Sequence, residues 1–325
     1  MHRAVVALVL LVACGPPPVS PDGYYYEPPA IGASESGDEP APLVDLATAG
    51  ISVQRSSEFA FDGGYIELEI RRDEGRVVEV ARNHYAVPVV MQWQLDNLDN
   101  LVPMAPPGGV AVLPAAPTPD GTGPPVVLTT LHVVDPTVPF HRNLSFHARF
   151  GDPNARPAEY VYRLPYRRGK TFAVLQGPHG AFSHRGSNEY AVDFDCPVAT
   201  HVLAARDGVV VAANAGAQGH GTTPAYLELR RVNFVLVLHD DGTLGEYMHL
   251  SPIGVEVQPG ARVRRGDEIA LSGNTGFSST PHLHFQVMTA ADDGIAARSF
   301  PFKLATARGR AEDPIQGRAY SSWEE

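Results

Sequence analysis

Apolar residues in this chain alternate with polar ones over short runs, and no long segment places them at the spacing of an α-helix. Successive side chains of a strand point to opposite faces, so this alternation predicts half-buried β-strands. The 31 glycines and 30 prolines fit frequent turns between short strands. At 325 residues the chain is long enough for two domains. We therefore expect an all-β protein of two domains.

Residues 43–165 contain three clear alternating runs, at 66–71, 89–95 and 145–150, with turn-rich segments such as 120–125 between them. Strands at this spacing predict an N-terminal β-sandwich, of the immunoglobulin-like kind. The histidines here are scattered singly and form no catalytic grouping. The sequence predicts the fold of this domain but not its role.

The N-terminus has the pattern of a targeting segment. A short basic start precedes a continuous apolar run from Ala4 to Ala13, which is too short to span a bilayer. The run ends Leu-Val-Ala-Cys, which resembles a bacterial lipoprotein signal and predicts lipidation of Cys14. An ordinary signal peptide with an incidental cysteine is the alternative. Residues 15–42, rich in Pro, Gly, Ser and acidic residues, predict a flexible tether.

These features predict an extracytoplasmic protein held to a membrane through the lipid on Cys14. Gly15 after that cysteine favours the outer membrane, facing the periplasm, if the host is Gram-negative. Cys196 is the second of two cysteines, so lipidation of Cys14 excludes an intrachain disulfide. The net charge of -11, without any Lys/Arg-rich block, argues against a nucleic-acid partner.

The second domain is expected at 166–305, with a C-terminal tail at 306–325. Its central stretch is Gly273–Val287, where a Gly/Ser/Thr-rich turn leads into a strand that carries His282, His284 and Gln286 on one face. A bare His-x-His motif is weak support for a metal site, because two solvated histidines would look the same. Hairpins are predicted over 198–212 and 234–250, the second ending with Tyr247 and His249 on one face.

A further strand is predicted at 190–194, with Asp193 on the face opposite Val192 and Phe194. Three separate strands thus each carry a histidine or aspartate directed away from the core. Catalytic zinc is held by three nitrogen or oxygen ligands with one position open for water. Two histidines and one aspartate supply that set, and the remaining histidines could act on the bound water and the developing oxyanion. The chain has no His-Glu-x-x-His motif, which excludes the helical type of zinc protease site.

The order of these motifs resembles the LytM/M23 family of lysostaphin-type zinc metallopeptidases. The resemblance covers about residues 172–287 and implies an antiparallel β-sheet metallopeptidase domain. It rests on His184 with Asp193, the segment 198–211, Tyr247-x-His249-Leu250, the turn at 263–267, and Ser272 to Gly276 leading to His282-Leu-His284-Phe.

Carried over by position, the resemblance implies Zn²⁺ bound by His184, Asp193 and His284. It also implies catalytic roles for His249 and His282, and substrate contacts from Tyr247 and Asn274. One departure concerns the first two ligands. Eight residues separate His184 from Asp193, where three are usual, which resembles a branch of the family with long His-to-Asp spacing. Asp195 and Glu189 are nearby alternatives to Asp193.

The predicted function is that of a zinc metalloendopeptidase that hydrolyses peptide cross-links of bacterial peptidoglycan. Its partners would be peptidoglycan peptide stems, and the membrane through Cys14. A catalytically silent LytM-type regulator that activates another cell-wall hydrolase is the main alternative, and a metal or sugar carrier is a third. The sequence does not choose between cross-links with diaminopimelate and glycine bridges.

Overall fold

The computed structural model describes residues 52–73, 75–118, 121–306 and 310–323. The predicted signal peptide with Cys14, the predicted tether at 15–42 and the first residues of the predicted sandwich lie outside this part of the chain. Within it, no helix combines the length and the hydropathy that a membrane span needs.

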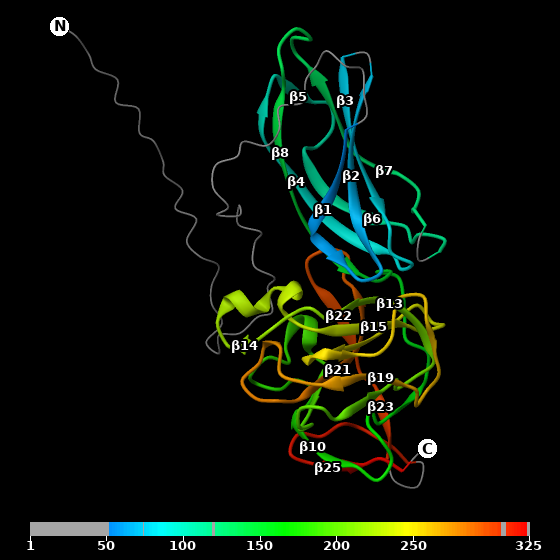
Figure 1. The fold of residues 1–325 in the computed structure, drawn as a ribbon. Coiled ribbons are helices and arrows are strands. Elements are labelled where there is room, and N and C mark those ends of the chain that lie inside the picture. The colour runs from blue at the N-terminus through cyan, green and yellow to red at the C-terminus, as the bar shows by residue number, and fades with distance from the viewer. Residues whose placement is uncertain (1–51, 74, 119–120, 307–309, 324–325) are drawn as a thin grey trace, which may run out of the picture.

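The N-terminal part folds as two antiparallel sheets that pack face to face, as expected for a β-sandwich (Figure 1). The five-stranded sheet has the order β1-β2-β3-β7-β5, and the three-stranded sheet the order β6-β4-β8. The immunoglobulin-like character of this sandwich stays a prediction. The strand bounds are β1 (Ser52–Phe61), β2 (Gly64–Asp73), β3 (Arg76–Asn83), β4 (Val89–Asp99), β5 (Leu101–Pro103), β6 (Gly108–Leu113), β7 (Val126–Val133) and β8 (His141–Phe150).

A nine-stranded sheet forms the centre of the C-terminal part. Its order is β18-β13-β15-β16-β21-β11-β10-β25, with β22 paired to β21, and every pairing in it is antiparallel. The bounds are β10 (Thr171–Gln176), β11 (Val192–Phe194), β13 (Gly208–Asn214), β15 (Phe234–Leu238), β16 (Leu244–Met248), β18 (Arg262–Val263), β21 (Leu283–Ala290), β22 (Ala297–Phe300) and β25 (Ala319–Ser321). Because β25 pairs with β10, the predicted C-terminal tail supplies a strand to this sheet.

Smaller sheets and turns surround the central sheet. One three-stranded sheet has the order β12-β19-β17, another the order β24-β23-β9, and β14 pairs in parallel with β20. Short 3₁₀ turns complete the fold. The bounds are β9 (Val161–Arg163), β12 (His201–Leu203), β14 (His220–Gly221), β17 (Leu250–Val255), β19 (Glu268–Ser272), β20 (Gly276–Phe277), β23 (Lys303–Thr306), β24 (Arg310–Glu312), η1 (Gly186–Asn188), η2 (Pro224–Leu227) and η3 (Leu229–Arg231).

The prediction of a hairpin over 198–212 is wrong. Strand β12 pairs with β19, whereas β13 pairs with β15 and β18, so the turn at 206–208 connects two different sheets. Arg206 anchors this turn from a nearly buried position, donating hydrogen bonds to Tyr162 Oη and Asp241 Oδ2. The hairpin predicted over 234–250 is confirmed, because β15 and β16 pair antiparallel along their length.

The central sheet is apolar on both faces. On one face Val235, Val237 and Phe285 pack into a core shared with β12, β17 and β19. On the other face Phe234 and Leu236, with further residues, join the core of the N-terminal sandwich. This double burial explains the uninterrupted apolar run Phe-Val-Leu-Val-Leu in β15. The sandwich and the central sheet therefore share one continuous hydrophobic core.

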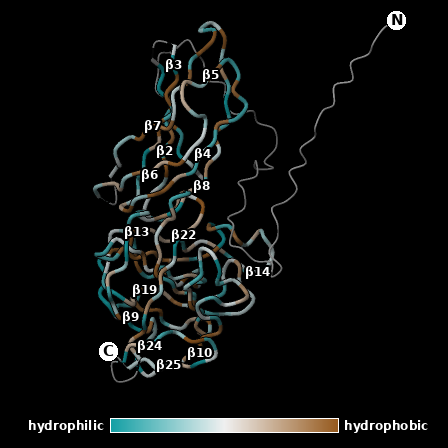
Figure 2. Tube along the Cα trace, turned by 180° about the vertical axis from the view of Figure 1, so that it is seen from behind, coloured by the Kyte–Doolittle hydropathy of each residue, from teal (hydrophilic) through white to brown (hydrophobic). Residues whose placement is uncertain are grey.

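The same alternation places polar residues beside the sandwich. In β21, His284 and Gln286 point to the face that also carries Met288, and Met288 packs in the core shared with the sandwich. Seen from behind, hydrophobic and hydrophilic segments are mixed through both parts, and neither part is uniformly apolar (Figure 2). The polar end of this face is where the candidate site lies.

Candidate metal centre and active site

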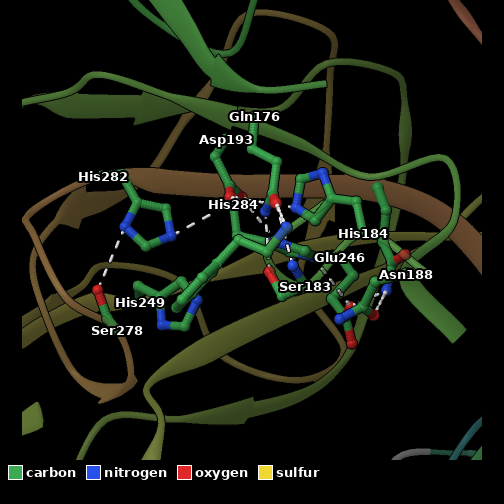
Figure 3. A network of polar contacts seen from close by, with 12 residues as sticks. Gln176, Ser183, His184, Asn188, Asp193, Glu246, His249, Ser278, His282 and His284 are labelled. Atoms are coloured by element: carbon green, nitrogen blue, oxygen red, sulfur yellow. Dashed lines mark hydrogen bonds and ion pairs between the residues drawn. The ribbon is translucent and has the colours of Figure 1, made fainter. Parts of the chain in front are cut away.

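Three buried side chains converge on one point of the central sheet: His184, Asp193 and His284 (Figure 3). Asp193 in β11 and His284 in β21 are directly opposite each other in the ladder, which brings their side chains together. His184 approaches from the loop before η1. One ligand atom from each residue lies within 4.8 Å of the others, and all three residues are buried.

Hydrogen bonds fix which atoms of these side chains face one another. His184 Nδ1 lies 2.9 Å from the carbonyl oxygen of Gly177, so Nδ1 carries the proton and donates it there. The other ring nitrogen, Nε2, then lies 3.1 Å from Asp193 Oδ2 with its lone pair free. His284 directs Nδ1 to Asp193 Oδ1 at 2.9 Å. The three atoms that converge are thus His184 Nε2, an Asp193 carboxylate oxygen and His284 Nδ1.

The carboxyl group of Asp193 is held ionised. Burial alone would raise its pKa, but the charges of His184 and His282, with the hydrogen bond from His284, keep that pKa well below its usual range. Burial likewise acts to lower the pKa of His284, yet the hydrogen bond and charge of Asp193 raise it overall. A carboxylate held as an anion between two imidazoles is a suitable set of donors for a divalent cation.

Gln176, at the end of β10, orients the aspartate and was not found by sequence reasoning. Its amide nitrogen donates hydrogen bonds to Asp193 Oδ2 at 3.1 Å and to Ser183 Oγ at 2.8 Å. Its carbonyl oxygen accepts from the backbone N–H groups of Phe182 and Ser183. One amide thereby ties the His184 loop to Asp193. The sequence signal was weak, because a glutamine at a strand end is usually solvated.

The long segment between His184 and Asp193 does not displace the aspartate from the cluster. The segment forms the 3₁₀ turn η1 and returns to the sheet at β11. Asp195, considered as an alternative ligand, is exposed, and Glu189 is half exposed and pairs with His179. Of the three carboxylates considered, the structure brings only Asp193 to His184 and His284.

Two further histidines flank the cluster. His249 Nδ1 donates to the Thr275 carbonyl at 2.7 Å, and His282 Nδ1 donates to the Thr280 carbonyl at 2.8 Å. Their rings lie 4.5 Å apart, and the His249 ring lies 5.9 Å from that of His284. Because Nδ1 of both rings is hydrogen-bonded to a carbonyl, Nε2 is the nitrogen left to face the site, and that of His282 lies 3.7 Å from Asp193 Oδ1.

The protonation of His249 follows from its surroundings. Burial, then the nearby charges of His282 and His284, hold the pKa of His249 well below its usual range. The imidazole is therefore neutral at neutral pH and able to accept a proton.

One groove of about 360 Å³ is lined by Asp193, His249, His282 and His284, whereas His184 is fully buried and does not line it. Phe182 and Phe277 form a stacked pair on its wall, with ring centroids 6.0 Å apart. Tyr226, from η2, lines the groove as well. A groove open to solvent above buried polar groups allows a peptide chain to reach them.

Neither of the two predicted substrate-binding residues lines the groove. Tyr247 is 0% exposed in the core on the opposite face of the sheet, where its hydroxyl accepts a 2.7 Å hydrogen bond from the Ala205 N–H. The prediction of a substrate contact from Tyr247 is therefore wrong. The strand ends at Met248, and His249 has a φ of 61°, so the alternation does not continue to His249. Asn274 accepts a hydrogen bond from Ser278 Oγ at 2.6 Å, and Ser278 rather than Asn274 lines the groove.

The side chains of this cluster are suited to hold a metal ion. His184 Nε2 is buried and, within the described residues, makes no hydrogen bond, although it faces a carboxylate. Such an orphaned lone pair is costly unless a ligand fills it. Two imidazole nitrogens and one carboxylate oxygen match the donor set of catalytic zinc sites, with room toward the groove for a further ligand.

An antiparallel β-sheet that carries this His–Asp–His cluster at the base of an open groove defines a candidate all-β metalloprotein. Residues 187–295 match the family model described as Peptidase family M23. The chain therefore contains a domain of the M23 peptidase family.

The chain is also similar to parts of named proteins. The chain is 38% identical over 126 residues to the glycyl-glycine endopeptidase ALE-1 of Staphylococcus capitis, covering 38% of this chain and 31% of the relative. It is 36% identical over 96 residues to the peptidoglycan DD-endopeptidase ShyA of Vibrio cholerae, covering 30% and 19% respectively. Among solved structures, the catalytic domain of lysostaphin from Staphylococcus simulans matches with 30% identity and a TM-score of 0.27, covering 41% of this chain and 88% of that domain. The chain thus spans a third or less of the length of these curated relatives.

Proposed function

We propose that this protein is a zinc-dependent endopeptidase that hydrolyses peptide cross-links of bacterial peptidoglycan. The observation that carries the proposal is the convergence of His184, Asp193 and His284 beneath a groove that also exposes His249 and His282. Support for the substrate comes from the relatives, which are named as glycyl-glycine and peptidoglycan endopeptidases.

In this proposal His184 Nε2, the Asp193 carboxylate and His284 Nδ1 hold the zinc. When bound there, zinc supplies a water whose pKa falls to about 7 and a Lewis acid for the scissile carbonyl. Gln176 keeps the Asp193 carboxylate turned toward the two imidazoles. The Gly177 carbonyl keeps the His184 ring in the tautomer that leaves Nε2 free.

His249 and His282 supply the proton chemistry. The neutral His249 ring accepts a proton at Nε2 from the attacking water and returns it to the leaving amine. His282 directs Nε2 to the same region, and in its protonated form it stabilises the negative charge that develops on the carbonyl oxygen. The Thr275 and Thr280 carbonyls fix both rings by accepting from Nδ1.

We further propose that the lipid on Cys14 and the tether at 15–42 hold this enzyme to a membrane outside the cytoplasm. The sequence pattern around Cys14 supports this part of the proposal. Mass spectrometry of the native N-terminus tests it: an acylated N-terminal cysteine supports the anchor, and an unmodified N-terminus at another residue contradicts it.

The decisive experiment measures soluble muropeptides that the untethered chain, residues 15–325, releases from purified sacculi. Matched variants are His284→Ala, which removes a ligand, and His249→Ala, which removes the base. We expect the wild type to release muropeptides in a zinc-dependent way and neither variant to release any. Of the two variants, only His249→Ala should retain zinc. No release from any wall type by the zinc-loaded wild type would contradict the proposal and favour a regulator of another hydrolase.

A further inference from the structure

A buried carboxylate lies behind the metal cluster, on the side away from the groove. Glu246 in β16 has a side chain 8% exposed, and its Oε2 lies 4.0 Å from His284 Nε2 (Figure 3). In the sheet register Glu246 is opposite Gln286, two residues beyond His284 on β21, so both side chains lie on the face of the cluster. The role of Glu246 inferred below rests on the proposed zinc site.

The chemistry of His284 requires a partner on this side. Its Nδ1 faces Asp193 at 2.9 Å and is the nitrogen available to a metal. An imidazole that gives its Nδ1 lone pair to a metal carries its proton on Nε2, which must then donate a hydrogen bond or remain buried without one. His284 Nε2 is buried and, in the described part of the chain, makes no hydrogen bond.

Glu246 is held in place to accept a hydrogen bond from that N–H group. The Gln286 amide nitrogen donates a hydrogen bond to Glu246 Oε2 and contacts Asn188 Oδ1 at 3.3 Å. Gln286 is itself 2% exposed, so this arrangement is rigid. A small rotation of the imidazole shortens the 4.0 Å between His284 Nε2 and Glu246 Oε2 to hydrogen-bond length.

The N-terminal sandwich closes this region from behind. Glu246 and Gln286 line a small cavity of about 40 Å³ whose other walls include Phe59, Arg149 and Phe150 of the sandwich. That volume is large enough to hold a water molecule. A carboxylate in such a place is costly to keep unless it has a partner, which argues for a specific role.

We propose that Glu246 is a positioning residue whose carboxylate accepts a hydrogen bond from the Nε2–H group of His284, and so fixes the tautomer and ring orientation of this metal ligand. The rival interpretation is a purely structural carboxylate that balances Arg149 across the same space. The two differ in one measurable quantity. A positioning role changes the affinity of the site for zinc, whereas a structural role changes thermal stability alone.

The test measures the Kd for zinc by chelator competition in the chain of residues 15–325. The variant is Glu246→Gln, which keeps the shape and removes the charge. The matched control is Glu79→Gln, the same change at a buried glutamate of the sandwich that pairs with Arg142. We expect a Kd about 10- to 100-fold higher for Glu246→Gln and within about twofold of wild type for the control. The visible absorption of the Co²⁺-loaded protein should change in parallel.

A second variant covers the case in which Glu246→Gln does not fold. Gln286→Met removes the amide that holds Glu246 and should also weaken zinc binding. Unchanged Kd and Co²⁺ spectrum in folded Glu246→Gln, or in Gln286→Met, would overturn the positioning role. If the wild type binds zinc tightly but releases no muropeptides, the proposed function is contradicted. The comparison of Kd values still decides the role of Glu246 in that case. A wild type that binds no zinc would overturn both.

Discussion

Leu236 and Val237 are neighbours in β15, yet their side chains lie in two different hydrophobic cores. Val237 packs against the smaller sheets of the C-terminal part, and Leu236 packs against the N-terminal sandwich. The sandwich is therefore not an appendage on a flexible linker. It covers one face of the sheet on which the candidate site is built.

Removal of the sandwich should destabilise the remainder. A chain that starts at residue 152 would expose Phe234, Leu236 and Met288, each worth about 1.5–3 kcal/mol of burial. We expect it to bind a hydrophobic dye and to aggregate, as measured by fluorescence and light scattering, whereas the chain of residues 15–325 does neither. A monomeric fragment with the thermal midpoint of the longer chain would contradict the shared core.

The choice of aspartate can be tested by metal content. Asp193→Asn should lose bound zinc. Of Glu189, Asp193 and Asp195, only Asp193 brings a carboxylate to the nitrogens of His184 and His284. Asp195→Asn, two residues away at an exposed position, should retain one zinc per chain. Metal analysis after dialysis against zinc-free buffer distinguishes them. Loss of zinc in Asp195→Asn with retention in Asp193→Asn would reverse the assignment.

Stability at acid pH should depend on Asp241. Burial would raise its pKa, but hydrogen bonds from Thr243 and Ala158 and the contact with Arg206 lower it to about 2, against 3.8 ordinarily. A carboxyl with a lowered folded-state pKa stabilises the fold fully above pH 3.8, and this contribution is lost as the pH falls toward 2. After allowance for screening by solvent, it amounts to about 1 kcal/mol.

Denaturant unfolding of wild type and Asp241→Asn at several pH values measures this contribution. The difference in free energy of unfolding should be largest at neutral pH and should shrink between pH 4 and 2, to the extent that the fold survives there. Asp240→Asn is the matched control, because Asp240 also contacts Arg206 but its side chain is 88% exposed. An equal loss in both variants would show that the buried position of Asp241 is not responsible.

Tyr247 should affect stability rather than substrate binding. Tyr247→Phe removes the hydroxyl that accepts from the buried Ala205 N–H, which costs about 1–3 kcal/mol. We expect a lower thermal midpoint and an unchanged KM for muropeptide substrates. A raised KM at unchanged stability would restore the substrate contact predicted from the sequence.

The alternating pattern of the sequence predicts individual strands well and their partners poorly. Leu283 and Phe285 lie in the core and His284 on the other face, as period-two alternation requires. The same rule failed between Tyr247 and His249, because the left-handed backbone at His249 interrupts the strand. It also could not show that the turn near Arg206 connects two sheets, since pairing depends on distant residues.

Two features of the site had a sequence signal that was not used. Glu246 interrupts the apolar pattern of β16, and a charged residue there is unusual unless it has a partner. The run from Phe234 to Leu238 lacks alternation, which is typical of a strand buried on both faces. Gln176, by contrast, acquires its role only through the loop that folds back to Asp193, and no local pattern indicates that.

The left-handed conformation of His249 lowers the stability of this domain while it serves the proposed catalytic function. The left-handed backbone at His249, with a φ of 61°, lowers the free energy of unfolding by about 1–2 kcal/mol. Burial of the polar imidazole lowers it further. Asparagine tolerates this backbone better, so His249→Asn should give a protein that is inactive yet no less heat-resistant than the wild type. The backbone conformation that turns the His249 imidazole out of the sheet and toward the groove is thus expected to lower the thermal stability of the domain.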